Sequence, residues 1–159
     1  MDQTKIESLL ADRGLSLPSV TPPVAAYVPA RAAGDLVFVS GQLPIRDGNL
    51  LAKGLVPNDV SEATATECAE QCALNALAAA LAAVPDGREL FGVVRVGVWV
   101  ASAPEFKAQP GIANGASELL QAVFGDRGRH ARAAVGSVAL PLGTPVEVEV
   151  LFELGDARS

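Results

Sequence analysis

The sequence predicts a single-domain α+β fold, in which one mixed β-sheet carries two helices on the same face. Three observations indicate this class. An alanine-rich segment at residues 61–84 repeats leucines three and four residues apart, which is typical of a helix packed on one side. Segments with an alternating hydrophobic pattern precede and follow it. The chain has 159 residues, half of them hydrophobic, which is enough for one core, and no internal repeat or linker divides it.

Residues 1–24 are expected to form a short helix and a proline-rich lead-in to the domain. Apolar residues share one face between Thr4 and Arg13, and Gly14 is a suitable stop. The lead-in contains prolines that prevent regular structure, namely Pro18, Pro22 and Pro23. We therefore predict an extended segment before the first strand.

The rest of the chain alternates between strands and helices. Ser61 is a plausible N-cap for the alanine-rich helix, and Asp47-Gly48 indicates a short hairpin. The expected strands are at residues 26–30, 36–43, 91–102, 131–140 and 145–154, and a second helix is expected at residues 112–124. The turn at residues 141–144 is interpreted as joining the last two strands in a hairpin.

Alternation along the 91–102 strand predicts two different faces. The valines at 94, 96, 98 and 100 form one face, which we expect to lie under a helix. The other face carries Arg95, Gly97 and Trp99, and the small residues Ala134 and Gly136 follow on a later strand. A sheet face of this mixed character suits packing against another subunit, so we expect an oligomer.

Composition and charge disfavour several classes of function. The net charge of −6 gives no basic footprint for nucleic acid, and no segment resembles a signal peptide or a membrane span, so we expect a cytoplasmic protein. The two cysteines, Cys68 and Cys72, are interpreted as small buried residues rather than a redox pair. With His130 as the only histidine, the sequence shows no zinc-binding cluster, and we predict no metal and no cofactor.

Several motifs together resemble the RidA/YjgF family. They are LVFVSGQLP at residues 36–44, WVAS at residues 99–102, and HARAAV at residues 130–135 followed by LPLGTPVEVEVLFEL at residues 140–154. The chain is most similar to the longer branch of about 150 residues, the endoribonuclease L-PSP-like proteins. The resemblance implies a chorismate-mutase-like fold, a homotrimer with clefts between subunits, and hydrolysis of reactive 2-imino and enamine acids to 2-oxo acids and ammonia.

The same resemblance implies the site residues. The carboxylate-binding arginine falls on Arg132, the acidic residue fifteen positions later on Glu147, and the tyrosine thirteen positions before the SGQ serine on Tyr27. An arginine can hold a carboxylate by two parallel charge-assisted hydrogen bonds. A carboxylate such as Glu147 can orient or deprotonate the water that attacks an imine carbon, and a tyrosine can hold the substrate.

The remaining implied contacts to substrate are Ser40, Gly41, Asn114 and position 134. Many members of the family have a cysteine or a small hydroxyl residue two positions after the arginine, whereas this chain has Ala134. That difference leaves the carboxylate clamp intact and puts the usual substrate range in question.

Each residue also has a structural interpretation. Arg132 would suit a strand end, Glu147 belongs to a row with Glu149 and Glu153 that would suit a solvated face, and His130 is interpreted as a loop histidine rather than a base. Two other functions therefore stay open. One is a regulatory trimer that binds small carboxylates without turnover, and the less favoured one is an endoribonuclease, which an acidic chain with one histidine supports poorly.

Strand geometry predicts how Arg132 and Glu147 are combined. If residues 141–144 close a hairpin, Glu147 lies opposite Val138, six residues from Arg132, which is roughly 20 Å at ~3.3 Å per residue. One small ligand cannot contact both side chains across that distance. We therefore predict that the two residues meet across a subunit boundary.

Overall fold

A five-stranded sheet organises the computed structural model, which describes residues 1–20 and 26–157. The strand order is β1-β2-β7-β5-β6, with β6 parallel to β5 and every other neighbouring pair antiparallel. The strands of this sheet are β1 (Ala30–Ala33), β2 (Leu36–Gln42), β5 (Arg88–Ala101), β6 (Ala131–Ser137) and β7 (Val146–Asp156). A small separate hairpin consists of β3 (Ile45–Arg46) and β4 (Asn49–Leu50).

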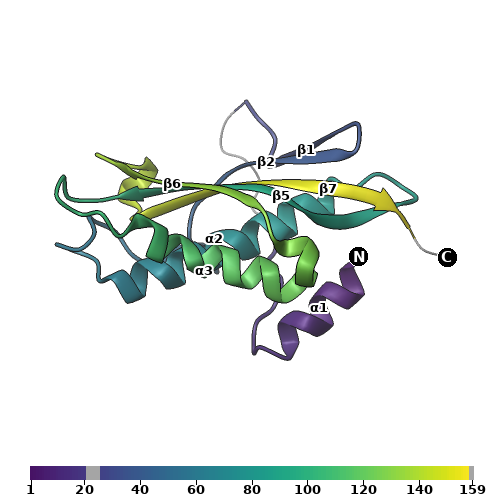
Figure 1. The fold of residues 1–159 in the computed structure, drawn as a ribbon, viewed down its shortest axis with the longest axis horizontal. Helices are drawn as coiled ribbons and strands as arrows, with labels where there is room; N and C mark the ends of the chain where they lie inside the picture. The colour runs from purple at the N-terminus through teal and green to yellow at the C-terminus, as the bar shows by residue number, and fades with distance from the viewer. Residues whose placement is uncertain (21–25, 158–159) are drawn as a thin grey trace.

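Two long helices, α2 (Glu62–Ala82) and α3 (Gln109–Phe124), cover one face of the sheet (Figure 1). The hydroxyl of Ser61 accepts a hydrogen bond from the Thr64 backbone N–H and so caps α2, as the sequence predicts. Gly115 lets α3 approach α2 closely, because a Cβ there would lie 2.2 Å from the Thr66 carbonyl oxygen. A third helix, α1 (Gln3–Ala11), packs against α3 through its buried residues Ile6 and Leu10.

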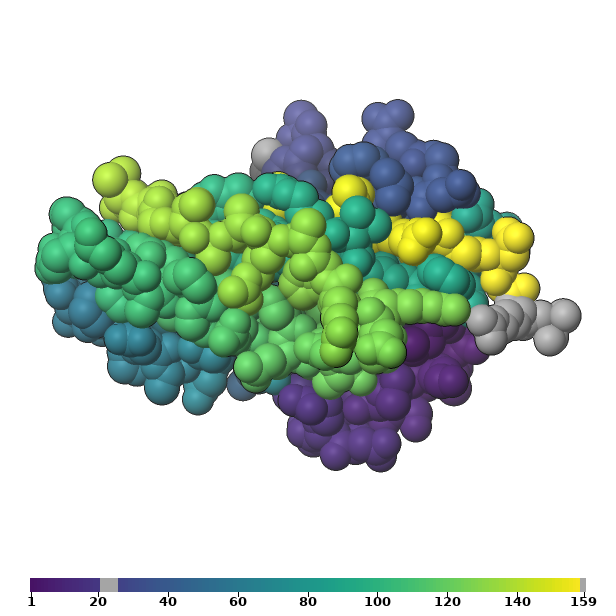
Figure 2. Space-filling view, viewed as in Figure 1, coloured from purple at the N-terminus to yellow at the C-terminus, as the bar shows by residue number. Residues whose placement is uncertain are grey.

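Among residues 1–20 and 26–157, no helix lies on the opposite face of the sheet. In the space-filling view the N-terminal helix (purple) and the β1–β2 hairpin (blue) lie at opposite sides of the molecule (Figure 2). Apolar side chains on or beside this face are exposed, including Phe38 at 51% and Val135 at 46%. Since buried valines of the same strands face the helices, the sheet separates one fully packed surface from one incompletely covered surface.

The predicted hairpin between the last two strands is wrong. Strand β5 lies between β6 and β7, and it pairs with both. The segment between them contains a short 3₁₀ turn, η2 (Pro141–Gly143), in which Leu142 has a φ of 58°. This segment returns the chain on the far side of β5, so the two strands flank a common neighbour instead of pairing with each other.

Three other predictions are corrected at the level of single strands. The first strand is Ala30–Ala33 instead of residues 26–30, because the Gly34-Asp35 turn pairs the residues directly beside it. The predicted strand 131–140 ends at Ser137. In β5 a register shift between Val93 and Arg95 places Val93 under the helices and leaves Val94 39% exposed, which breaks the expected valine face. Pro22 and Pro23 lie outside the described residues.

Candidate active site

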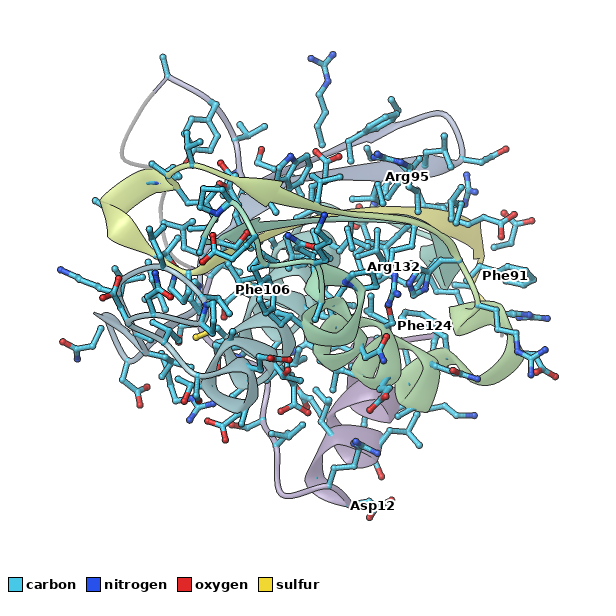
Figure 3. All side chains as sticks on the ribbon, turned by 60° about the vertical axis from the view of Figure 1, so that its left-hand side comes forward. Asp12, Phe91, Arg95, Phe106, Phe124 and Arg132 are labelled. Atoms are coloured by element: carbon cyan, nitrogen blue, oxygen red, sulfur yellow. The ribbon has the colours of Figure 1, made fainter. Side chains whose placement is uncertain are left out.

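Arg132 lies near the start of the edge strand β6, and its side chain reaches back to helix α3 (Figure 3). Its Nη1 donates to Asn114 Oδ1 at 2.9 Å and to Ser117 Oγ at 3.0 Å, and its Nη2 donates to the Pro110 carbonyl at 3.3 Å. Asn114 and Ser117 are three residues apart, so they share one face of the helix. The first turns of α3 therefore fix the position of the guanidinium.

The guanidinium of Arg132 keeps two N–H groups available for a ligand. An arginine has five N–H donors, and three of them are used by α3. Within the described part of the chain, no carboxylate lies within 4.0 Å of Arg132, although its side chain is exposed. A held cation with free donors and no acidic partner is well suited to bind a carboxylate.

Ser117 and His130 extend this hydrogen-bonded arrangement from α3 to the loop before β6. The Ser117 hydroxyl lies 3.0 Å from His130 Nε2, and His130 Nδ1 lies 2.6 Å from the Gly128 carbonyl oxygen. Burial of the imidazole, together with the positive charge of Arg132, lowers the pKa of His130 below 6.5, although the bond to Gly128 acts in the opposite direction. We call Arg132, Asn114, Ser117 and His130 the arginine cluster.

Glu147 lies on β7, and its carboxylate rests directly on the backbone of Gly41. A Cβ at Gly41 would lie 1.9 Å from Glu147 Oε1 and 2.8 Å from its Cδ, so only glycine leaves room for this carboxylate. Gly41 lies where the register of β2 against β7 shifts, between Val39 and Gln42. A close approach of this kind explains why the SGQ segment has glycine at this position.

The charge of Glu147 is not compensated by a neighbouring cation. Within residues 1–20 and 26–157, Glu147 has no ion pair, whereas Glu149 on the same face pairs with Arg95 at 2.8 Å. Partial burial, and secondly the charge of Glu149, raise the pKa of Glu147 above 4.5. A carboxylate with a raised pKa is a better proton acceptor near neutral pH than an ordinary one. Glu147, Gly41 and Ser40 form what we call the glutamate cluster.

Ser40 connects this cluster to the segment that follows Tyr27 through contacts with the backbone. The Ser40 hydroxyl donates to the Val28 carbonyl at 2.8 Å, and the Ser40 N–H donates to the Pro29 carbonyl at 2.9 Å. These bonds attach the segment after Tyr27 to β2, and Tyr27 itself is 51% exposed. Since the Ser40 hydroxyl already donates to a carbonyl, its observed role is structural.

Ala134 belongs to the arginine side of the sheet. It lies two residues after Arg132 on β6, is level with Val98 of β5, and packs partly against the hydrophobic core. Its methyl group offers no hydrogen bond to a ligand. The structure therefore brings together Arg132 and Asn114, with Ala134 along the same strand, and keeps Tyr27, Ser40, Gly41 and Glu147 apart from them.

One chain cannot place Arg132 and Glu147 on the same small ligand. Arg132 is level with Val96 of β5 and Val150 of β7, and Glu147 lies three residues further along and two strands across, roughly 14 Å away between Cα atoms. Val150 faces the helices, and an offset of three residues puts Glu147 on the opposite face. The distance expected from the hairpin was wrong, but the separation within one chain remains.

The described residues provide no alternative metal or cysteine site. No group of three or more His, Cys, Asp or Glu side chains among them could hold a metal ion. Cys68 and Cys72 are buried on α2, and burial raises the pKa of Cys68 to about 11, which makes its thiol unreactive. Three surface cavities of about 670, 260 and 450 Å³ formed by described residues are lined by neither Arg132 nor Glu147.

Comparison with known proteins identifies the family. Residues 18–153 match the family described as endoribonuclease L-PSP, which is also known as RidA/YjgF. The chain belongs to this family. The endoribonuclease L-PSP match includes all the residues of the arginine and glutamate clusters.

Individual members of the endoribonuclease L-PSP family are similar over most of the chain. Protein TCP17 of Trypanosoma cruzi is 37% identical over 153 residues, covering 96% of each chain. The RutC family protein y4sK of Sinorhizobium fredii is 34% identical over 131 residues, covering 82% of this chain and 89% of its own. The crystal structure of Agrobacterium tumefaciens Atu1372 superposes with a TM-score of 0.85 at 42% identity, over 96% of this chain and 94% of that one.

Two sequence expectations can be compared with the structure directly. The fold class is confirmed, with one main sheet and with α2 and α3 on the same face. No helix of the described residues is long and apolar enough to cross a membrane.

Sequence reasoning missed Ser117, whose only sequence signal is its spacing of three residues from Asn114.

Proposed function

We propose that this protein hydrolyses reactive 2-imino acids and their enamine tautomers to 2-oxo acids and ammonia, in clefts between the subunits of a homotrimer. The observation that carries the proposal is the hydrogen bonding of Arg132. Its guanidinium is fixed by three bonds to α3, has no acidic partner among the described residues, and keeps donors free. This arrangement favours a small ligand whose recognised group is a carboxylate.

The carboxylate clamp orients the substrate for attack by water. Nε and the remaining Nη2 hydrogen of Arg132 can bind one carboxylate oxygen each, which fixes the imine carbon two bonds away. An imine carbon is already electrophilic, so the protein has to supply position and proton transfer rather than a strong nucleophile. No metal or cofactor is required for this reaction.

Glu147 is the proton acceptor in the proposed mechanism. It removes a proton from water as the water oxygen bonds to the imine carbon and the C=N electron pair moves to nitrogen, and it passes that proton to the nitrogen to give a neutral carbinolamine. Glu147 then takes the proton of the carbinolamine hydroxyl and delivers it to the nitrogen. The C=O bond forms as the C–N bond breaks, and the products are a 2-oxo acid and ammonia. The half-buried position and raised pKa of Glu147 suit both proton transfers. Tyr27 is proposed to close the cleft from the side of Ser40.

An oligomer supplies the geometry that one chain lacks. Arg132 and Glu147 are roughly 14 Å apart on opposite faces of one sheet, so a shared ligand requires a second copy. The uncovered sheet face, with Phe38 and Val135 exposed, is available for packing between copies. A ring of three such contacts would create three equivalent clefts.

Ala134 favours one alternative function. The methyl group leaves the clamp without the thiol or hydroxyl contact found in many relatives, and a clamp alone would suit a trimer that binds carboxylates for regulation. RNA cleavage, which the family description suggests, is less well supported. Both nitrogens of His130 are engaged within the chain, and the net charge is −6.

An assay with an imine generated in place tests the proposal. An amino acid is converted enzymatically to 2-iminobutyrate, and the loss of the imine is followed with and without the protein. We expect acceleration by the wild type and a loss of about 10²-fold or more in kcat/KM for Arg132→Ala, since a charge-assisted carboxylate contact is removed. Arg129→Ala is the matched control, because Arg129 is an exposed arginine nearby whose ion-pair partner among the described residues is Asp126.

The alternatives give different outcomes. Binding of 2-oxobutyrate without any acceleration would favour the regulatory trimer. RNA cleavage that persists in Arg132→Ala would place the activity outside the proposed cleft.

A further inference from the structure

We propose that His130 is a positioning residue, which holds Arg132 in its ligand-binding orientation through the hydroxyl of Ser117, and does so only while the imidazole is neutral. This inference rests on the proposed function of Arg132 as a carboxylate clamp. It assigns a task to two residues, one on the loop before β6 and one on α3, that do not contact the substrate.

The direction of each hydrogen bond in this chain of groups follows from chemistry. The Gly128 carbonyl can only accept, so His130 Nδ1 carries a proton and donates it at 2.6 Å. In a neutral imidazole Nε2 then has a free lone pair, which accepts from the Ser117 hydroxyl at 3.0 Å. The guanidinium can only donate, so Arg132 Nη1 donates to the lone pair of Ser117 Oγ at 3.0 Å.

The Gly128 carbonyl, at the end of this chain of hydrogen bonds, is held in a fixed position. Gly128 ends the 3₁₀ turn η1 (Gly125–Gly128), is buried, and packs on the backbone of α3. A Cβ there would lie 2.6 Å from both the Leu120 carbonyl oxygen and the Gln121 Cα, so the close contact requires glycine. The Gly128 carbonyl is therefore fixed relative to α3, which also holds Ser117 and Asn114.

Protonation of His130 would disrupt the sequence of donors and acceptors that links Gly128, His130, Ser117 and Arg132. A protonated Nε2 becomes a donor, so Ser117 Oγ would have to accept from two cations and its own hydrogen would need a new acceptor. The imidazolium would also face the guanidinium of Arg132. The hydrogen bond from Arg132 to Ser117 is then weakened, and ligand binding weakens with it.

Other charged groups around His130 are already engaged or turned to solvent. On η1 and the following residue, Asp126 and Arg129 lie 3.7 Å apart, and Arg127 stacks on the ring of Phe91. On β5, Arg95 is paired with Glu149. On α3, the side chains facing Arg132 are neutral, and Glu118 is exposed to solvent. The charge that acts on His130 is that of Arg132, which opposes protonation.

The imidazole itself gives a direct readout, because His130 is the only histidine of the chain. Nitrogen-15 NMR of labelled protein distinguishes the two tautomers and follows the titration without overlap. We expect the proton on Nδ1, a hydrogen-bonded Nε2 without a proton, and a pKa below 6.5. We expect Ser117→Ala to shift the Nε2 resonance. A proton on Nε2, or an unchanged resonance in Ser117→Ala, would overturn the proposal.

Binding of 2-oxobutyrate, measured by calorimetry, tests the effect on Arg132 without turnover. Ser117→Ala should raise Kd about threefold to tenfold, since one of three contacts holding the guanidinium is lost, while Ser117→Thr keeps the hydroxyl and should restore binding. The Kd of the wild type should rise as pH falls through the pKa of His130. In His130→Gln, which does not titrate, this rise should disappear. The added positive charge attracts the carboxylate weakly, because solvent and salt screen it over this distance.

The kinetic pattern separates positioning from structure and from the proposed function. With 2-iminobutyrate we expect Ser117→Ala to raise KM and leave kcat nearly unchanged, whereas a loss of fold would lower kcat as well. If Arg132→Ala abolishes binding but Ser117→Ala and His130→Gln bind like the wild type at every pH, positioning is overturned and the proposed function stands. If wild-type protein binds 2-oxobutyrate but hydrolyses no imine, the activity fails, and Kd still decides the role of His130. If it binds no carboxylate, both proposals are overturned.

Discussion

The arginine cluster and the glutamate cluster are held in place by different means. Arg132 is fixed by three hydrogen bonds to α3, so its neighbours determine its orientation. Glu147 occupies the space left by the missing side chain of Gly41, is partly buried, and makes no ion pair within the described part of the chain. The first arrangement is a preorganised cation, and the second is a carboxylate whose pKa is raised by its surroundings.

The comparison predicts that ligand binding and the chemical step are divided between the two clusters. Substitutions in the arginine cluster should change mainly the affinity for carboxylates, whereas substitutions in the glutamate cluster should change mainly the rate of the chemical step. The predictions below test this division, starting with the largest effect.

Replacement of the proposed proton acceptor has the largest expected effect. Glu147→Gln keeps the size of the side chain and removes its basicity, so kcat for 2-iminobutyrate should fall about 10²-fold to 10⁴-fold with little change in the Kd for 2-oxobutyrate. Glu153→Gln is the matched control, because Glu153 lies on the same face of β7 and is exposed. A variant with wild-type kcat would remove Glu147 from the mechanism.

A methyl group at position 41 should lower kcat by a smaller factor than Glu147→Gln and leave carboxylate binding intact. In Gly41→Ala the new Cβ would lie 1.9 Å from Glu147 Oε1, so the carboxylate has to move. A displacement of about 1 Å at a catalytic group can reduce kcat by up to about 10²-fold, and we expect a tenfold loss or more with 2-oxobutyrate binding retained. Gly111→Ala on α3 is the control, since a Cβ there meets no atom within 4 Å. Equal losses in Kd and kcat would contradict the division.

The smallest expected effect is on stability as a function of pH. The pKa of folded Glu147 is raised above 4.5, so the folded chain binds a proton there more readily than the unfolded chain. The contribution of this group to the free energy of unfolding therefore falls as pH rises from 4.5 through the raised pKa. Urea unfolding between pH 4 and 8 should show Glu147→Gln gaining on the wild type over that window, by less than about 1 kcal/mol because the group is partly exposed. A difference that does not vary with pH would show that the pKa is unperturbed.

Much of the fold follows from local patterns in the sequence. The leucine spacing and Ser61 predict α2 and its cap, because a helix is specified by neighbours three and four residues apart. The pairing of β6 and β7 could not be predicted in this way. The turn residues between them resemble a hairpin, and only tertiary packing shows that β5 is inserted between the two strands.

The candidate site was likewise only partly predictable from the sequence. Arg132 and Glu147 were assigned by resemblance to a family, and their assigned roles remain predictions. The contact of Glu147 with Gly41 depends on a register shift in β2, which alternation alone does not reveal. Ser117 gives no signal as a single serine in a helix, because its importance comes from contacts with Arg132 and His130 on another element.

Mixing two variants of greatly reduced activity tests the central claim most directly. Arg132→Ala and Glu147→Gln are unfolded together, refolded as a mixture, and assayed with 2-iminobutyrate beside each variant refolded alone. If each cleft takes Arg132 from one subunit and Glu147 from its neighbour, random assembly should restore about a quarter of the wild-type activity, because one cleft in four receives both intact residues. If both residues of a cleft come from the same chain, no cleft is intact, and a mixture as inactive as its components would contradict the account.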